Sequence, residues 1–192
     1  MKIDRKLNFI LEVERDEGKA FVYATPLHRL VFEKYFEVIT ETQNKMMEKG
    51  PEWLLRMGPL VAKLMLKKVA EEAGIWGGME GVERGVLAEI RRTTSVLMPT
   101  DAGWDAVPLQ HALDTKFFEP EDAEEVENAV VFFTVGCASM KRAQRDPFME
   151  AASVLWGASV TSLPLTEYQS SLPMPNAEEN IGEKVRQSSI PR

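Results

Sequence analysis

The sequence predicts a mainly α-helical protein with a small N-terminal antiparallel β-hairpin, an α+β chain with a helical bundle-like domain and a disordered C-terminal tail. Two observations predict this fold. Apolar residues near the N-terminus alternate with polar ones, which is the two-residue period of a strand. From Leu27 onward they recur at steps of three and four, which is the period of a helix. With 192 residues and 44% hydrophobic content, the chain can bury one substantial core.

The hairpin is expected over residues 7–24. Apolar and polar side chains alternate from Leu7 to Val13, and a second apolar run follows at 20–24. The polar segment between them contains Gly18, which can adopt a positive φ angle in a turn. An isolated hairpin is only marginally stable in water, so we expect it to pack on helices or to join the sheet of another chain.

Three helices are expected next, over residues 26–49, 52–73 and 80–97. Thr25 can cap the first helix and Pro26 suits its first position, where no N–H group is required. Pro59 is expected to kink or split the second helix because proline cannot donate the backbone hydrogen bond. The glycines between 74 and 85 are predicted to form a hinge, since no Gly-Lys-Ser/Thr phosphate-binding motif follows them.

The remaining helices are expected over 105–114, 121–143 and 147–156. The acidic residues at 119–127 are interpreted as the cap and solvated face of the long apolar helix, where they complement its dipole. Beyond Gly157 the helical pattern weakens, and the proline-rich polar end is predicted to be disordered. The predicted division is therefore a hairpin (1–25), a helical domain (26–172) and a disordered tail (173–192).

Charge and cysteine content narrow the class of protein. The formal net charge is −7, from 30 acidic and 23 basic residues, which disfavours a general nucleic-acid binder. Cys137 is the single cysteine, so no internal disulfide can form, as in a reducing cytosol. No apolar run approaches the roughly 20 residues of a membrane span, and the first residues lack the apolar region of a signal peptide. We expect a soluble, cytoplasmic protein that binds no membrane.

No residue set predicts catalysis, a cofactor or a metal site. His28 and His111 fall in different predicted helices, and neither has a Cys or His partner at ligand spacing. Cys137 lies in an apolar helix, which predicts a buried and unreactive thiol. The protein is therefore expected not to be an enzyme.

Three apolar groups are candidates for binding a protein partner. Core packing is the favoured interpretation of the first two groups and an equal alternative for the third. In the first group, apolar residues recur at steps of four and three, which predicts a helical seam for a partner helix. The second group consists of methionines in the middle helices, because methionine side chains adapt to irregular partners. The third group follows the last long helix. The surplus of apolar helical surface also predicts a weak homo-oligomer. The seam consists of Val126, Val130, Phe133, Cys137 and Met140; the methionine candidates are Met46, Met47, Met57 and Met65; the third group is Leu163, Leu165, Tyr168 and Leu172.

The segment EEVENAVVFFTVGCAS, followed by LWGASVTSLPLTEYQSSLP and a polar arm ending SSIP, resembles tail assembly chaperones of long-tailed bacteriophages and prophages. The resemblance runs from Val96 to the C-terminus. It implies a non-enzymatic protein of the host bacterial cytoplasm that binds the tape-measure protein while the tail tube protein polymerises. Such proteins are absent from the mature virion. The alternative is a structural minor tail or tail-completion protein that stays in the particle.

Overall fold

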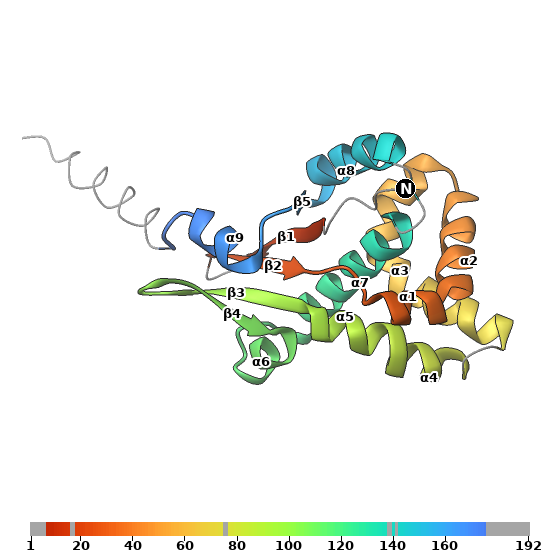
Figure 1. Cartoon of the computed structure of the whole chain (residues 1–192), viewed down its shortest axis with the longest axis horizontal. Helices are drawn as coiled ribbons and strands as arrows, with labels where there is room; N and C mark the ends of the chain where they lie inside the picture. The colour runs from red at the N-terminus through yellow and green to blue at the C-terminus, as the bar shows by residue number, and fades with distance from the viewer. Residues whose placement is uncertain (1–6, 16–17, 75–76, 138–139, 141, 176–192) are drawn as a thin grey trace, which may run out of the picture.

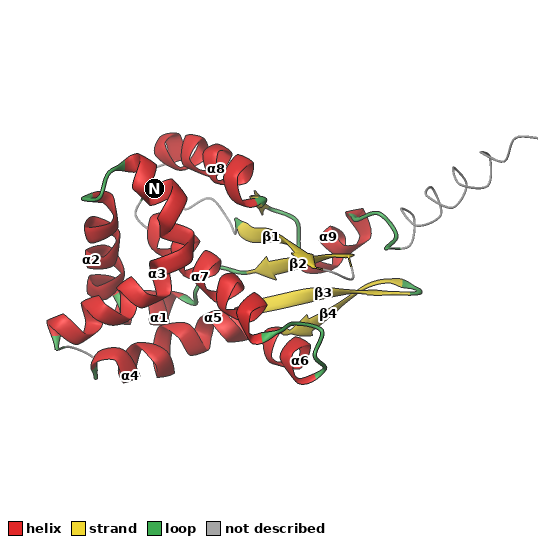
Figure 2. Ribbon diagram, turned by 180° about the vertical axis from the view of Figure 1, so that it is seen from behind, coloured by secondary structure: helices red, strands yellow, loops and turns green. Residues whose placement is uncertain are grey.

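The computed structural model describes residues 7–15, 18–74, 77–137, 140 and 142–175. Its fold is α+β: a five-stranded antiparallel sheet, in the order β4-β3-β2-β1-β5, packs against helices (Figure 1). The prediction of a helical bundle with only a small N-terminal hairpin is therefore wrong. Seen from behind, helices α1 to α5 gather at one end of the molecule and the β3–β4 hairpin extends at the other (Figure 2).

The predicted hairpin is present as strands β1 (Asn8–Arg15) and β2 (Gly18–Ala24), which pair antiparallel. Gly18 has a φ angle of 114°, which explains a glycine at that position. The side chains of Phe9, Leu11 and Val13 belong to the buried core, as their alternation predicted.

Strands β3 (Thr94–Thr100), β4 (Gly103–Pro108) and β5 (Ala158–Thr161) extend the hairpin into the larger sheet. Strand β3 pairs with β2, β4 pairs with β3, and β5 pairs with β1. The helical patterns predicted helix over residues 94–97 of β3 and 105–108 of β4, and this part of the prediction is wrong. The helix before β3 ends earlier because the hydroxyl groups of Thr93 and Thr94 donate hydrogen bonds back to carbonyl oxygens one turn before them.

The first predicted helix is divided at Tyr35 into α1 (Arg29–Lys34) and α2 (Phe36–Met47). The ring of Tyr35 is buried, and its hydroxyl donates to the carbonyl oxygen of Gly81 at 3.0 Å. The second helix, α3 (Pro51–Ala73), contains Pro59 and is not split.

The third predicted helix is present over its first part, as α4 (Gly78–Val82), a π-helical turn η1 (Glu83–Leu87) and α5 (Ala88–Thr93). Glycine is required at position 85, because a Cβ atom there would lie only 2.0 Å from the hydroxyl oxygen of Tyr35.

The short helix α6 (Leu109–Asp114) precedes α7 (Pro120–Cys137), the long apolar helix, which packs on α3 and β1. Helices α8 (Arg142–Trp156) and α9 (Leu165–Ser171) complete the described part of the chain. Most of the predicted tail, from residue 176 onward, lies outside the described residues. The helical seam of α7 belongs to the core: Val126 and Val130 are buried, and Phe133 and Cys137 pack against the same cluster.

Candidate functional site

The outer face of the sheet, which faces away from α7, carries a second apolar layer. Ile10, Tyr23 and Leu97 are 4%, 3% and 0% exposed, yet they lie outside the helix-packed core. Their positions alternate with those of Phe9, Val22 and Val96, which face the helices. A cover must therefore lie on this outer face.

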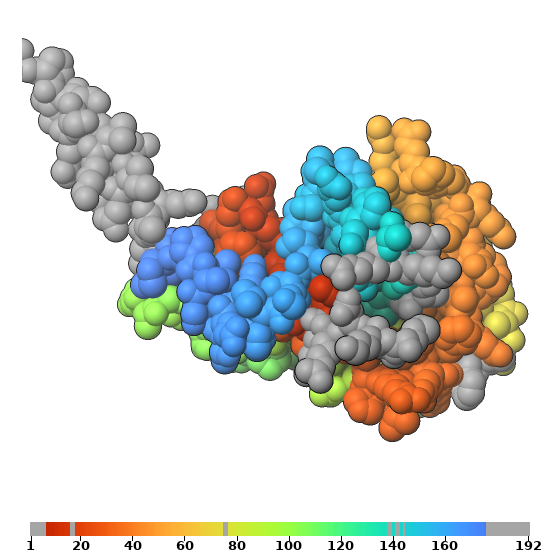
Figure 3. All heavy atoms as spheres, turned by 45° about the horizontal axis from the view of Figure 1, so that its top comes forward, coloured from red at the N-terminus to blue at the C-terminus, as the bar shows by residue number. Residues whose placement is uncertain are grey.

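That cover is the segment from Leu163 to Pro173, which contains α9 and is here named the strap. The Leu163 carbonyl oxygen accepts hydrogen bonds from Asn8 Nδ2 (3.1 Å) and from the Tyr23 hydroxyl (2.9 Å). At the far end, the indole N–H of Trp104 donates to the Pro173 carbonyl at 2.7 Å. In the space-filling view the strap lies between the β1–β2 and β3–β4 hairpins (Figure 3).

The third candidate group belongs to this strap. Tyr168 packs near Tyr23, with ring centroids 5.9 Å apart, and burial raises the pKa of both hydroxyls. Leu165 and Leu172 are half-buried, and Leu163 is 36% exposed. The structure therefore gives these four residues an intramolecular contact.

The methionine candidates do not form one surface. Met46 is 1% exposed and Met65 packs against the core, so both are structural. Met47 and Met57 are 45% and 40% exposed and lie on α2 and α3. Only these last two remain available to a partner.

Met57 belongs to a group that the sequence analysis did not separate from the core, here named the α3 stripe: Met57, Leu60 and Leu64. Their exposed fractions are 40%, 49% and 63%. Steps of three and four place them on one side of α3, whereas Ala62 and Leu66 are fully buried. The sequence signal that could have revealed the stripe is that apolar residues occur on more than one face of α3.

Exposed apolar side chains are concentrated on the first three helices. Among the described residues, eleven large apolar side chains are exposed, and six of them lie on α1, α2 and α3. Leu30 on α1 and Phe36 and Met47 on α2 join the stripe in this set. This concentration distinguishes the α1–α3 layer from the rest of the described surface, because scattered single apolar residues are ordinary on any protein.

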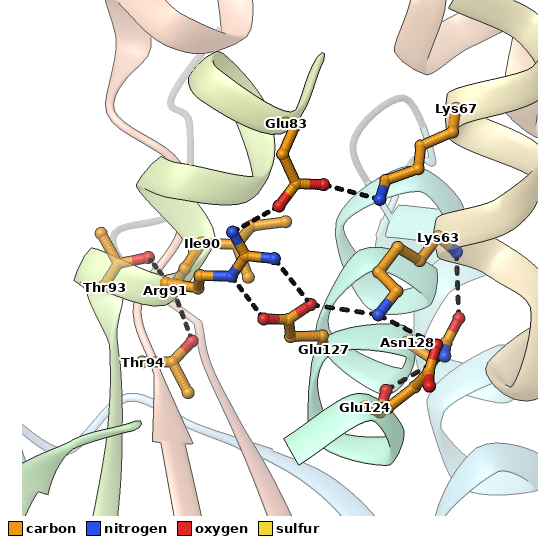
Figure 4. A network of polar contacts seen from close by, with 10 residues as sticks. All are labelled: Lys63, Lys67, Glu83, Ile90, Arg91, Thr93, Thr94, Glu124, Glu127 and Asn128. Carbon is orange, nitrogen blue, oxygen red and sulfur yellow. Dashed lines mark hydrogen bonds and ion pairs between the residues drawn. The ribbon is translucent and has the colours of Figure 1, made fainter. Parts of the chain in front are cut away.

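A network of charged side chains joins α3, η1, α5 and α7 (Figure 4). Arg91 donates to both carboxylate oxygens of Glu127, at 2.5 and 3.1 Å, and Lys63 approaches Glu127 at 3.2 Å. Glu83 lies 2.5 Å from Arg91 and 2.6 Å from Lys67. The interpretation of Glu127 as part of a solvated acidic face is wrong, since the residue is only 8% exposed.

The network stabilises the fold and presents no reactive group. Burial acts to raise the pKa of Glu127, but hydrogen bonds from Arg91 and the charges of Arg91 and Lys63 hold it below its usual value. The same hydrogen bonding raises the pKa of Arg91. Both partners therefore remain charged at neutral pH, and their contacts tie α7 to α3 and α5.

The two histidines and the cysteine that the sequence offers as reactive residues do not form a site together. His28 caps α1 and His111 lies in α6, both exposed. Burial raises the pKa of the Cys137 thiol to about 12. Within the described residues, no group of three or more His, Cys, Asp or Glu side chains could hold a metal ion. No described helix is long and apolar enough to cross a membrane.

Comparisons with protein-family models, with curated proteins and with solved structures found no match for this chain.

Proposed function

We propose that this protein is a non-catalytic tail assembly chaperone of a long-tailed bacteriophage or prophage. In this proposal it acts in the host bacterial cytoplasm, binds the tape-measure protein while the tail tube protein polymerises, and is absent from the mature virion. The resemblance of the C-terminal half supports the family, and the exposed apolar surface of α1–α3 supports the binding activity. Homo-oligomers are compatible with the same surface.

The observation that carries the proposal is the α3 stripe. Large apolar side chains on one side of a rigid helix offer a partner helix an apolar face that it can cover. Methionine adds adaptability, because its unbranched side chain can follow an irregular partner surface. A tape-measure protein is a long helical chain, and a protein that covers its apolar helices competes with their aggregation in proportion to concentration and affinity.

Co-expression with the tape-measure protein of the same phage tests the proposal. We expect the soluble fraction of the tape-measure protein to rise with the wild-type chaperone. It should fall back when Met57, Leu60 and Leu64 are all changed to Gln, which removes apolar surface and keeps a residue that favours helix. The matched control changes Val154 and Leu155 to Gln, since these are 83% and 52% exposed on α8. Equal loss in both variants would contradict a site on α3.

Mass spectrometry of purified virions separates the chaperone from the alternative of a minor tail or tail-completion protein. A chaperone is released before the particle is complete, so its peptides should be missing. Stoichiometric peptides in intact virions would replace the chaperone proposal with the structural one.

A further inference from the structure

A groove between α2 and the C-terminal part of α3 has an apolar floor and an acidic side. Its volume is about 450 Å³. Phe36 and Val38 of α2 and Val69 and Ala73 of α3 form the apolar lining. Phe36 is 47% exposed, so a large aromatic surface stands open to an incoming chain.

The acidic side consists of Glu37 and Glu41, which are one helical turn apart on α2 and both line the groove. Both are exposed, and no described residue forms an ion pair with either. The neighbouring base, Lys45, is already paired with Glu72. Glu72 raises the pKa of Lys45 through a hydrogen bond, and the charges of Glu41 and Glu48 add to the rise. Carboxylates therefore outnumber bases along this side of α2.

We propose that the α2–α3 groove binds one class of segment: a basic amphipathic helix whose apolar face contacts Phe36 and whose Lys or Arg side chains pair with Glu37 and Glu41. Helix α2 has 12 residues, so it offers a side about 18 Å long, which matches about three turns of a bound helix. This inference rests on the proposed function and deepens it, because it states the chemistry of the segment that the chaperone would hold.

Charge complementarity favours this occupant over a second copy of the same surface. Two copies of α2 placed side by side would bring Glu37 and Glu41 near the same residues of the partner, and like charges repel. A basic helix would neutralise those carboxylates and cover the apolar floor at the same time. Its binding should weaken as salt rises, because exposed ion pairs are screened.

The test uses two synthetic 14-residue helical peptides with the same leucine face, one with lysines and the other with glutamates on the polar face. Fluorescence anisotropy of the labelled peptides with the full chain should show binding of the lysine peptide and at least about tenfold weaker binding of the glutamate peptide. The double variant Glu37→Gln/Glu41→Gln should weaken the lysine peptide about fivefold, as expected from two exposed ion pairs.

A control variant distinguishes binding in the groove from general electrostatic attraction of the lysine peptide to an acidic protein. Glu121→Gln/Glu125→Gln makes the same charge change at the same spacing on α7, where both residues are exposed. It should leave the affinity for the lysine peptide within about twofold. Equal weakening by the two double variants would overturn the proposal. Phe36→Ser should also weaken binding, and unchanged affinity with a normal circular dichroism spectrum would overturn the role of the apolar floor.

The peptide-binding test of the groove and the co-expression test of the proposed function can fail independently of each other. If the lysine peptide binds in the groove but the tape-measure protein is not solubilised, the groove stands and the chaperone proposal fails. If the tape-measure protein is solubilised equally by wild type and by Glu37→Gln/Glu41→Gln, the chaperone proposal stands and the groove is not its contact.

Discussion

The outer face of the sheet and the outward face of α3 are both apolar, but among the described residues only the sheet face has a covering segment. Ile10, Tyr23 and Leu97 on the sheet are at most 4% exposed, and the strap contacts Tyr23. On α3, Leu60 and Leu64 stay 49% and 63% exposed. Both faces lie opposite the same core, so apolar content alone does not separate a structural surface from a surface open to a partner.

This contrast indicates where on the molecule partner contacts should be sought. Leu165, Tyr168 and Leu172 have the spacing of a docking helix, but all three are half-buried and Tyr168 packs near Tyr23 of the sheet, which gives the strap a structural role within the chain. The α3 stripe has the same kind of spacing, and its side chains are 40% to 63% exposed, so no described segment covers them. Four variants, taken in order of decreasing predicted effect, test whether stability follows this contrast.

Phe132 belongs to the core that both faces share, and Phe132→Ala is expected to cause the largest loss of stability among the four variants. The ring is 4% exposed and packs near Phe148, with centroids 5.4 Å apart. The helical pattern also places Phe133 in the predicted seam, but its ring is only half-buried and stacks on Phe9. Removing the Phe132 ring should lower the free energy of unfolding by about 3–5 kcal/mol in urea titrations. A loss below about 1 kcal/mol would show that the core is not packed as described.

Glu127→Gln tests the charged network that holds α3, the helix with the uncovered face, against α7. The substitution leaves Arg91 and Lys63 without their shared carboxylate and should cost about 3 kcal/mol. Glu125→Gln on the same helix is the control, since Glu125 is exposed. Because the folded-state pKa of Glu127 is lowered, its contribution is present above the ordinary carboxyl pKa of 4.5 and is lost as pH falls below that value. Wild type should therefore lose more stability than the variant between neutral pH and pH 3; equal losses would contradict the pairing.

The strap is tested by changing Leu163, Leu165, Tyr168 and Leu172 to Ser. These side chains are at most half-buried, so the expected cost is about 2 kcal/mol, less than for the core ring. Amide hydrogen exchange should also quicken at β2 and β3, under the strap, while α7 stays protected. A melting temperature unchanged from wild type would contradict the contrast between the two faces, because the strap residues would then contribute as little to stability as the α3 stripe.

The smallest effect is expected for the α3 stripe. Changing Met57, Leu60 and Leu64 to Gln should alter the free energy of unfolding by less than about 0.5 kcal/mol, since the side chains are exposed and Gln favours helix. Self-association measured by sedimentation should become weaker if this surface forms the predicted homo-oligomer. A loss of stability comparable to that of the strap variant would show that the stripe is covered in the folded protein.

Elements whose signals are local could be predicted from the amino-acid sequence alone. The alternation around Phe9 and Leu11 defined the β1–β2 hairpin, and Pro120 with its acidic neighbours marked the start of α7. The partial burial of Cys137, which raises the pKa of its thiol, also agrees with the apolar residues around it. Such signals depend on neighbours within a few positions, which the sequence displays directly.

The remaining strands, the strap and the charged network depend on contacts between segments that are distant in the sequence. Val96 becomes part of a strand because β2 supplies its hydrogen-bonding partner, about 70 residues away in the chain and invisible to local periodicity. Glu127 is buried because Arg91, 36 residues earlier, neutralises it. Tyr168 covers the sheet while Leu64 stays exposed, although both lie on amphipathic helices. The physical reason is the same in each case: burial depends on which distant surface comes to lie against a side chain, and a helix of given pattern is equally able to form with or without that contact.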